Sequence, residues 1–328
     1  MMHRRAFVTG VAGSLIVAAN IVRAQAPPKV PRVAILHSSP AATFGSSGIM
    51  AIRNGLRDLG YVEGQSLMLE FRSPAAGAEL LPVHASEMVR LNADVIIAIG
   101  PAALRAARDA TTVLPIVAMD LETDPVASGF ARSLGRPTGN ITGIFMDSEL
   151  AGTWLGLLRA VAPKIQTMGA LWDSGSGSAQ LDTVKGAAQD IGVKLLVLET
   201  TSANDLDVAL DAGLKGGATA LVILSSPVVG ATVNSKRIAA FATSNRLPAI
   251  SPFRSFTEAG GLMSYGPSIL DVYRDTSTFT DKILKGAKPG DLPIEPPNKY
   301  ELVISRKTAK TLDLVIPQSL ERQAALID

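Results

Sequence analysis

Short apolar runs alternate with amphipathic segments along most of this chain. The predicted strands of the first half occupy residues 32–37, 66–71, 94–99 and 115–119. Segments with apolar residues at helical spacing separate them, at residues 44–59, 79–91 and after Gly100. Strands separated by helices of about 10–15 residues predict parallel pairing through right-handed crossovers.

The same rhythm begins again in the second half. Predicted helices occupy residues 149–161, 179–191, 206–214 and 234–245, and predicted strands occupy residues 167–172, 193–198, 218–224 and 248–250. The two halves therefore have the same order of elements at similar spacing. This weak internal repeat predicts two similar lobes that face each other across one cleft.

Residues 120–143 lie between the two halves, and we expect them to hold two turns, a helix and a crossing between lobes. After Gly260, a strand at residues 262–265 and a helix at 269–284 are expected to return to the first lobe. A connector at 288–297 then leads to a last strand at 299–305 and a short helix at 306–312 in the second lobe. Crossings near Gly143, Gly260 and Pro293 would form a hinge.

These patterns predict an α/β fold of two Rossmann-like lobes with parallel sheets, joined by a three-crossing hinge. The first lobe is expected to comprise residues 25–143 plus 261–292, and the second residues 144–260 plus 293–328. The composition agrees, because aromatic residues are only 5% of the chain while the small aliphatic residues typical of buried parallel strands are abundant. With 328 residues, each lobe can bury its own core.

The first 24 residues have the pattern of a signal peptide. Arg4 and Arg5 precede an apolar run at residues 6–21, and Val22 and Ala24 are small residues at suitable positions for cleavage near Ala24. The arginine pair leaves both the Sec and the twin-arginine route open. A retained anchor helix is the alternative, but the run is short for a span of about 20 residues.

Charge and cysteine content narrow the functional classes. Three of the 31 Lys+Arg lie in residues 1–24, which leaves 28 against 29 Asp+Glu and gives no basic excess for nucleic acid. A DNA-binding regulator would need a helix-turn-helix before the first strand, and residues 25–31 leave no room for one. Because the chain has no cysteine, it has no thiol for lipid attachment. We expect a periplasmic monomer that is not embedded in the membrane after cleavage.

The chain lacks the motifs of catalysis. Its histidines are His3, His37 and His84, and only His37 follows a predicted strand, where a polar strand-end residue is the simpler interpretation. No HExxH, GxSxG, Walker or dinucleotide-binding sequence occurs. We therefore expect no enzyme activity, no cofactor and no metal.

Polar turns at the carboxyl ends of parallel strands are the places where such sheets bind ligands. The chain offers residues of this kind at strand ends in both predicted lobes. The candidate ligand-binding residues are Ser38, Ser39, Gly100, Pro101, Ala102, Asp120, Phe145, Trp172, Asp173, Ser225, Ser226, Phe253 and Tyr265. Phe145 and the residues after it are assigned to the second lobe, except Tyr265, which is expected on a crossing strand near the hinge.

Several of these residues suggest a specific contact, each with a structural alternative. Gly100 and Pro101 open a helix whose N–H groups would attract a carboxylate, although Pro101 is also a favourable first helical residue. Asp120 and Glu122 could pair with an amine or be solvated. Trp172 could form an apolar wall or belong to the core, and Asp173 could hold an ammonium group.

The sequence resembles the type I periplasmic substrate-binding proteins of ABC transporters, in the branch related to tryptophan-binding proteins. The resemblance covers essentially the whole chain after the leader. It rests on residues 60–65 (GYVEGQ), 124–126 (DPV), 136–143 (RPTGNITG), 264–267 (SYGP), 300–304 (YELVI) and 316–317 (IP). The chain departs from the family at Trp172-Asp173-Ser174-Gly175, where an Asn-Pro turn is frequent.

This resemblance implies the solute-binding component of an ABC importer. It would bind a small organic ligand in the cleft by hinge closure and deliver it to an inner-membrane ABC permease. The implied ligand is an amino acid, an aromatic one included, or another small carboxylate. A receptor that serves a sensor kinase or chemoreceptor is the alternative, and an exported α/β enzyme is disfavoured by the missing motifs.

Overall fold

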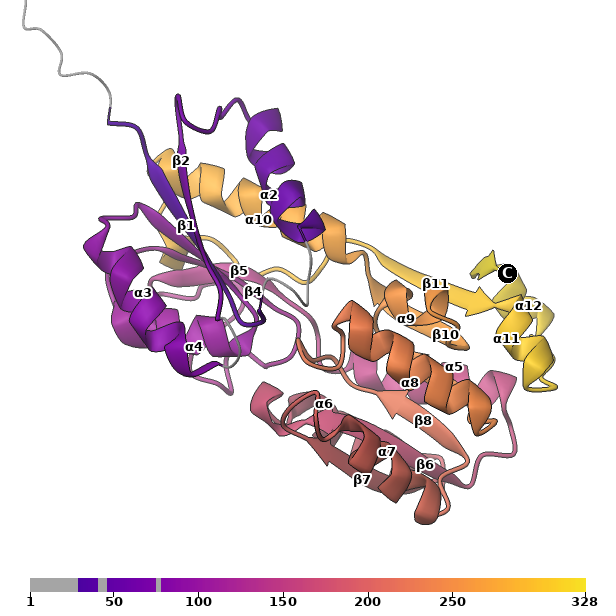
Figure 1. Ribbon diagram of the computed structural model, residues 1–328. Coiled ribbons are helices and arrows are strands. Elements are labelled where there is room, and N and C mark those ends of the chain that lie inside the picture. The colour runs from indigo at the N-terminus through magenta and orange to yellow at the C-terminus, as the bar shows by residue number, and fades with distance from the viewer. Residues whose placement is uncertain (1–28, 41–45, 75–77) are drawn as a thin grey trace, which may run out of the picture.

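The computed structural model describes residues 29–40, 46–74 and 78–328. In this part of the chain two sheets form the centres of two lobes that lie next to each other (Figure 1). The leader predicted for residues 1–24 lies outside the described residues, as does the predicted start of the first helix at residue 44. The α/β fold with predominantly parallel sheets is confirmed.

The first lobe contains a five-stranded parallel sheet among the described residues. Its order is β2 (Met68–Arg72), β1 (Arg32–His37), β3 (Val95–Ile99), β4 (Ile116–Asp120) and β5 (Ile141–Phe145). Its helices are α2 (Ser47–Asp58), α3 (Leu81–Arg90), α4 (Pro101–Ala110) and α10 (Ile269–Leu284), with a 3₁₀ turn at Ala78–Leu80.

Alternation along the buried strands sorts the core of this lobe onto two faces. Val33 and Ile35 of β1 belong to the core under α2 and α10, whereas Ala34 and Leu36 belong to the core under α3 and α4. Because successive side chains of a strand point to opposite faces, a fully apolar strand implies helices on both sides. The apolar runs of the sequence correctly predicted this arrangement.

The second lobe contains a seven-stranded sheet among the described residues. Its order is β12 (Ala325–Ile327), β11 (Tyr300–Ser305), β10 (Met263–Pro267), β9 (Ala249–Ser251), β8 (Ala220–Ile223), β6 (Thr167–Asp173) and β7 (Lys194–Thr200). β10 and β11 pair antiparallel, and the remaining pairs are parallel. This antiparallel pair follows from the chain's return out of the first lobe.

Helices cover both faces of the second sheet. One face packs against α5 (Leu150–Val161) and α6 (Ala179–Asp190), and the other against α7 (Leu206–Lys215), α8 (Thr232–Ser244) and α9 (Arg254–Glu258). The short helices α11 (Arg306–Thr311) and α12 (Gln318–Glu321) lie at the edge near the C-terminus. Further 3₁₀ turns occupy Ser174–Ser176 and Pro289–Asp291.

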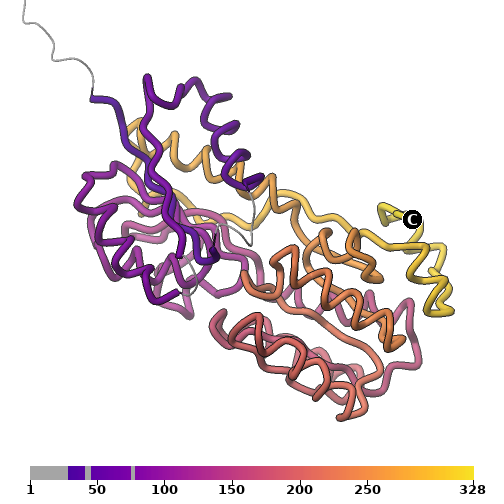
Figure 2. Tube along the Cα trace, viewed as in Figure 1, coloured from indigo at the N-terminus to yellow at the C-terminus, as the bar shows by residue number. Residues whose placement is uncertain are grey.

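The described chain crosses between the lobes three times, as Figure 2 lets the reader follow. It leaves the first lobe after β5, returns from β10 directly into α10, and leaves again before β11. The last crossing begins after Glu295, which still bridges to Ile144 of the first sheet. The crossings thus lie a few residues beyond the expected Gly143, Gly260 and Pro293.

Two predicted placements are wrong. The strand predicted at residues 262–265 forms as β10, but it pairs with β9 and β11 in the second sheet rather than joining the first lobe. Phe145 ends β5 opposite Asp120 of the first sheet, so it does not belong to the second lobe. In both cases the chain stays in its sheet for one strand longer than the turn residues suggested.

The segment between β4 and β5 has turns but no α-helix among its residues, all of which the structure describes, so the helix expected there is absent. The Asp124 carboxylate accepts hydrogen bonds from the N–H groups of Val126 and Ala127, which fixes a turn in place of a helix. Gly143 of β5 has φ 134°. A Cβ there would lie 2.1 Å from the carbonyl oxygen of Ala118, so only glycine permits β5 to pair at this register.

Candidate functional site

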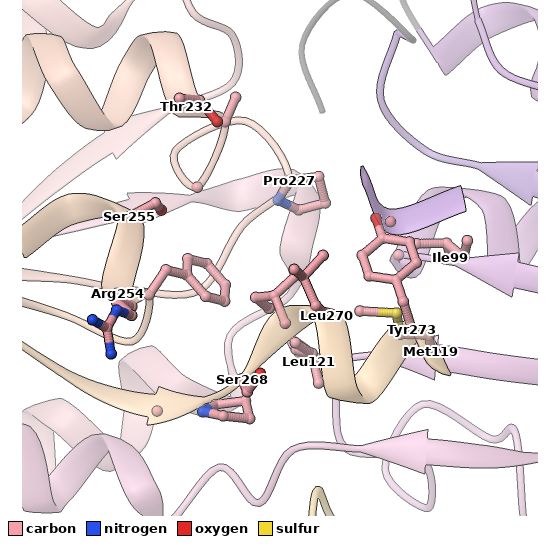
Figure 3. A pocket seen from close by; sticks show the side chains of 18 of the residues that line it. Ile99, Met119, Leu121, Pro227, Thr232, Arg254, Ser255, Ser268, Leu270 and Tyr273 are labelled. Atoms are coloured by element: carbon pink, nitrogen blue, oxygen red, sulfur yellow. The ribbon is translucent and has the colours of Figure 1, made fainter. Parts of the chain in front are cut away.

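A cavity of about 570 Å³ lies between the lobes. It is bordered by the carboxyl ends of β1, β3 and β4 on one side and by the loop after β8 and the start of α9 on the other. In Figure 3, Ile99, Met119 and Tyr273 lie on one side, Arg254 and Ser255 on the opposite side, and Leu270 between them. Its volume is in the range of about 300–1,000 Å³ typical of small-molecule sites.

The walls of the cavity are mainly apolar. Ile99, Met119 and Leu121 come from the strand ends of the first lobe, Phe253 from the second lobe, and Leu270 from the first turn of α10. The side chains of all these residues except Leu270 are almost completely shielded from solvent. An apolar ligand body placed here would exclude water from these side chains, which favours binding.

Glu122 brings a carboxyl group into the buried part of this cavity. It is 7% exposed, and its carboxyl accepts hydrogen bonds from Ser225 Oγ at 2.8 Å and from the N–H of Leu121 at 3.1 Å. Burial raises the pKa of Glu122 well above its usual value, and the charge of neighbouring Asp120 raises that pKa further. Glu122 therefore remains protonated more readily than an ordinary glutamate.

The other charged lining residues that the structure describes form a cluster at the second lobe. Arg254 pairs with both Glu258 and Glu301 at 2.7 Å. These side chains are about half exposed, so the pairs contribute little to stability. With Glu122, the described lining carries three acidic groups against one basic group, and the basic group is already paired. The cavity consequently favours a ligand with a positive charge.

His37 and Tyr273 form a second polar feature of the cavity wall. His37 Nε2 lies 2.8 Å from Tyr273 Oη, and the N–H of Ser39 donates to His37 Nδ1 at 2.9 Å. Burial lowers the pKa of His37 to about 3, so the imidazole is neutral near pH 7. Burial also raises the pKa of Tyr273, with a further contribution from the charge of Glu122. Both groups therefore keep one protonation state across the physiological range.

The lobes contact each other along one side of the cavity. Glu122 of the first lobe binds Ser225 of the second. Gln180 at the start of α6 donates from Nε2 to the carbonyl of Leu121 at 2.7 Å, while its Oε1 accepts from the N–H of Ser225. Arg105 of α4 donates to the carbonyl of Gly175. These contacts hold the lobes close together beside the cavity.

Four of the residues predicted from the sequence line the cavity together. Ser39 and Gly100 border it from the first lobe, and Ser226 and Phe253 from the second. Ser39 Oγ also lies 3.4 Å from the carbonyl of Pro227, which joins the two sides at this point. The expected convergence of strand ends is therefore present at the cavity.

The other predicted residues of the first lobe do not line the cavity. Ser38 Oγ accepts the N–H of Ala103 and so caps the helix that Pro101 and Ala102 begin. The Asp120 carboxylate accepts from the N–H groups of Glu122 and Thr123 and from Thr123 Oγ1. Its hydrogen bonds thus stabilise its own loop and position Glu122.

The predicted residues of β6 and β8 likewise make contacts within the protein. Trp172 Nε1 donates to the carbonyl of Gly177. Asp173 accepts from the N–H of Gly175 and from Ser226 Oγ at 2.6 Å. Ser225 binds Glu122, as described above. None of these three borders the cavity in the described structure, so Asp173 does not offer its carboxylate to a ligand here.

Phe145 and Tyr265 also lie away from the cavity wall. Phe145 is 4% exposed and packs in the core of the first lobe, with its ring 6.5 Å from that of Phe130. Tyr265 points its ring toward Tyr300 on β11, with 6.2 Å between the ring centroids. Its neighbour Gly266 lines the cavity instead, because alternate residues of a strand face opposite sides.

Sequence reasoning missed Tyr273 and Gln180. Tyr273 lies within a helix more than 230 positions after His37, so no local pattern connects the two. Gln180 is 4% exposed, and a buried glutamine in the first turn of a helix has no sequence signature. The buried hydrogen-bond partners of Tyr273 and Gln180 are what mark these residues as functional. Those partners can be recognised only once the fold is known.

The comparisons with known proteins agree with this geometry. Residues 29–327 match the family described as ABC transporter substrate binding protein. The tyrosine-binding protein of Clostridioides difficile is 25% identical over 268 residues, which is 79% of this chain and 74% of that protein.

Two solved structures extend the comparison to the fold. A conserved domain protein of Vibrio cholerae superposes with a TM-score of 0.84 at 22% identity, covering 92% of this chain and all of that one. An ABC domain from Streptococcus pneumonia in complex with L-Trp has a TM-score of 0.82 at 22% identity, covering 91% of this chain and 99% of that one. Both show the same fold.

Two lobes, three crossings and a cavity between strand ends define the two-lobed fold in which solute-binding proteins close around a ligand. The match over nearly the whole described chain identifies the family: this chain belongs to the ABC transporter substrate-binding proteins. It is therefore a solute-binding component that takes a small ligand and works with a membrane permease. Among the described residues, no helix combines the length and apolarity needed to cross a membrane.

Proposed function

We propose that this protein acts outside the cytoplasm, closes its two lobes around an apolar or aromatic amino acid, and delivers it to an ABC permease. The observation that carries the proposal is the pairing of a buried carboxyl, Glu122, with apolar walls in one interlobe cavity. The protein binds its ligand without transforming it and is exported as a monomer through the leader at residues 1–24.

The charge of the cavity supports an ammonium group on the ligand. Arg254 is engaged by Glu258 and Glu301, whereas Glu122 has no basic side chain as a partner among the described residues. A ligand ammonium next to Glu122 would stabilise the ionised carboxylate through a charge-assisted hydrogen bond. A ligand with only negative charge would meet net repulsion.

The walls support an apolar or aromatic side chain. Ile99, Met119, Leu121, Phe253 and Leu270 would surround it, and Phe253 offers a ring for edge or stacking contact. Relatives described as binding tyrosine and L-tryptophan support the same class. Among the predicted residues, Ser39, Gly100, Ser226 and Phe253 are the ones we propose to contact the ligand.

Lobe closure supplies the binding mechanism. The contacts of Ser225 and Gln180 across the lobes exist only when the lobes are close together. A ligand that touches both lobes binds the closed form more tightly than the open form, and it shifts the population by that difference in affinity. The closed form is the one we expect the permease to recognise.

Isothermal titration calorimetry of the purified protein tests this function. Tyrosine, tryptophan and leucine are compared with two analogues of tyrosine. Tyramine lacks the carboxylate, and 4-hydroxyphenylpropionate lacks the amine. We expect the amino acids to bind, and Glu122→Gln to weaken their binding by about 10- to 100-fold, since a hydrogen bond between charged groups is lost. Binding of the amine-free acid alone would overturn the proposal.

A further inference from the structure

The hydrogen-bond chain from Ser39 to Tyr273 fixes the direction of one hydroxyl in the cavity. A backbone N–H can only donate, so His37 Nδ1, which lies 2.9 Å from Ser39 N, must hold a lone pair. Because burial lowers the pKa of His37 to about 3, the ring is neutral and its hydrogen is on Nε2. Nε2 therefore donates to Tyr273 Oη at 2.8 Å.

Tyr273 consequently has a hydroxyl hydrogen that His37 does not use. Within residues 29–40, 46–74 and 78–328, no acceptor for this hydrogen is present. Tyr273 is only 6% exposed, and its side chain lines the cavity (Figure 3). A buried donor without an acceptor is unfavourable. Binding of a ligand that places an acceptor at this position would therefore be favoured.

The phenol ring has little freedom to turn away. It lies nearly parallel to the ring of His37, with 6.3 Å between centroids and an interplanar angle of 10°, and the hydrogen bond from Nε2 to Oη joins the two rings at their edges. On another side it meets α2 at Gly48, where even a Cβ would lie 2.7 Å from the ring. The direction of the hydroxyl is thus set before a ligand arrives, which limits the entropy lost on binding.

The surroundings of Tyr273 favour an anionic acceptor. The first turns of two long helices border the same cavity, α2 at Ser47 and Gly48 and α10 at Ile269 and Leu270. Helix N-termini carry partial positive charge and exposed N–H groups. Among the described residues, α2 has no side-chain cap for these groups. Ser268 Oγ already accepts the N–H of Asp271 at the start of α10, so the N–H groups of α2 are the ones we expect to meet a carboxylate that also accepts from Tyr273.

We propose that Tyr273, oriented by His37, donates a hydrogen bond to the carboxylate of the ligand, and that the site thereby selects α-amino acids over amines with the same side chain. This inference rests on the proposed amino-acid function and adds the group that reads the carboxylate. Glu122 and Tyr273 border one cavity. The charge of Glu122 acts on Tyr273, and an acceptor and a donor on the wall of one cavity match the ammonium and carboxylate of an α-amino acid. His37 acts as a positioning residue.

The test compares two ligands that differ only in the carboxylate. Dissociation constants of tyrosine and tyramine, and of tryptophan and tryptamine, are measured by calorimetry for the wild type and for Tyr273→Phe. We expect Tyr273→Phe to weaken amino-acid binding by about 10- to 100-fold, because a bond to a charged group is lost, and amine binding by less than about 3-fold. The ratio of the two constants is independent of the fraction of folded protein.

Tyr61→Phe is the matched control. It removes the hydroxyl that donates to Asp281 of the same helix α10, outside the cavity lining, and should leave both constants unchanged. His37→Gln tests the positioning role, since its amide can donate or accept and no longer dictates the direction of the Tyr273 hydroxyl. We expect His37→Gln to reduce the preference for amino acids over the corresponding amines. The melting temperature of this variant should stay close to that of the wild type.

The outcomes separate the inference from the function on which it rests. A wild type that binds none of the amino acids overturns the proposed function and the inference together. A wild type that binds them, combined with a Tyr273→Phe variant that weakens amino acids and amines equally or not at all, overturns the inference alone. A loss confined to the amino acids supports both.

Discussion

Ser225 Oγ of the second lobe donates a hydrogen bond to Glu122 Oε1 of the first lobe across a distance of 2.8 Å. Gln180 reinforces the contact, since its side-chain amide binds the backbone of both Leu121 and Ser225. All of these bonds are buried. The group that we propose to receive the ligand ammonium is therefore also a group that joins the lobes, which couples ligand binding to closure.

Ser225→Ala should weaken ligand binding by making the closed form less stable. A buried neutral hydrogen bond contributes about 0.5–1.5 kcal/mol net, so we expect a loss of up to about 10-fold in affinity. Calorimetry with tyrosine measures the loss, and small-angle scattering should show a more open average without ligand. Ser86→Ala is the control, because its hydroxyl donates to Pro82 within α3 at the surface. Equal affinity in the two variants would contradict the coupling.

Ligand binding should release a proton at pH values below the raised pKa of Glu122. Burial and the charge of Asp120 raise this pKa, so below it the empty site holds a proton that an incoming ammonium displaces. Affinity is then expected to fall as the pH falls below that raised pKa, because protonated Glu122 competes with the ligand. His37, with a pKa of about 3, and Tyr273, with a raised pKa, contribute no titration there.

Calorimetry in buffers of different ionisation enthalpy measures this proton. The observed enthalpy should vary with the buffer for the wild type and stay constant for Glu122→Gln. If the wild type shows no dependence on the buffer between pH 6 and 8, Glu122 is already ionised in the empty site or does not meet the ammonium.

The sequence predicted the class of fold because the same pattern, a short apolar run for each buried strand, recurs along the chain. Each buried parallel strand is an apolar run such as residues 94–99, and the run itself specifies helices on both faces. Placement failed where a strand lacks that character. β10 contains Ser264, Tyr265 and Gly266, a polar and turn-like composition, so its pairing in the second sheet depends on the antiparallel partner β11.

The site could be predicted only as far as strand ends define it. Ser39 and Ser226 follow strands whose ends meet at the cavity, and this is a property of the topology. Trp172 and Asp173 also follow a strand, yet their side chains serve a turn and the cap of a short 3₁₀ helix. Which strand-end side chain faces the cavity depends on the backbone conformation of the loop that follows the strand. The residue types alone do not determine this conformation.

Gly48→Ala should lower ligand affinity without unfolding the first lobe. A methyl group at Gly48 would lie 2.7 Å from two atoms of the Tyr273 ring, so the ring must move away from its bond with His37. Gly55→Ala is the matched variant on the same helix. Its methyl would meet Ser277 at 2.5 Å, and neither residue lines the cavity.

We expect Gly48→Ala to raise the dissociation constant for tyrosine and Gly55→Ala to lower stability instead. The intrinsic preference of a helix for alanine over glycine, about 1 kcal/mol, partly offsets the clash in both variants. Calorimetry and urea unfolding on the two proteins separate the effects. The same change in affinity for both variants would show that the spacing of α2 and α10, rather than Tyr273, controls the site.

His37 should make the protein less stable in acid. Its pKa is about 3 in the folded protein against 6.5 for the ordinary group, so the unfolded chain binds more protons between these values. The free energy of unfolding therefore falls as the pH decreases below about 6.5, by roughly 3 kcal/mol at pH 4 for an isolated group. Glu122 acts in the opposite direction, since its raised pKa means that the folded form binds the proton more tightly.

A comparison of variants isolates the histidine from this opposing effect. His37→Gln keeps a partner for Tyr273 but does not titrate, so its stability should fall less than that of the wild type between pH 7 and pH 4. Urea unfolding at each pH gives the difference, and the m-values confirm that the same surface is exposed. Parallel curves for the two proteins would mean that the pKa of His37 is the same in the folded and unfolded states. The neutral ring, on which the donor direction assigned to Tyr273 depends, would then lose its basis.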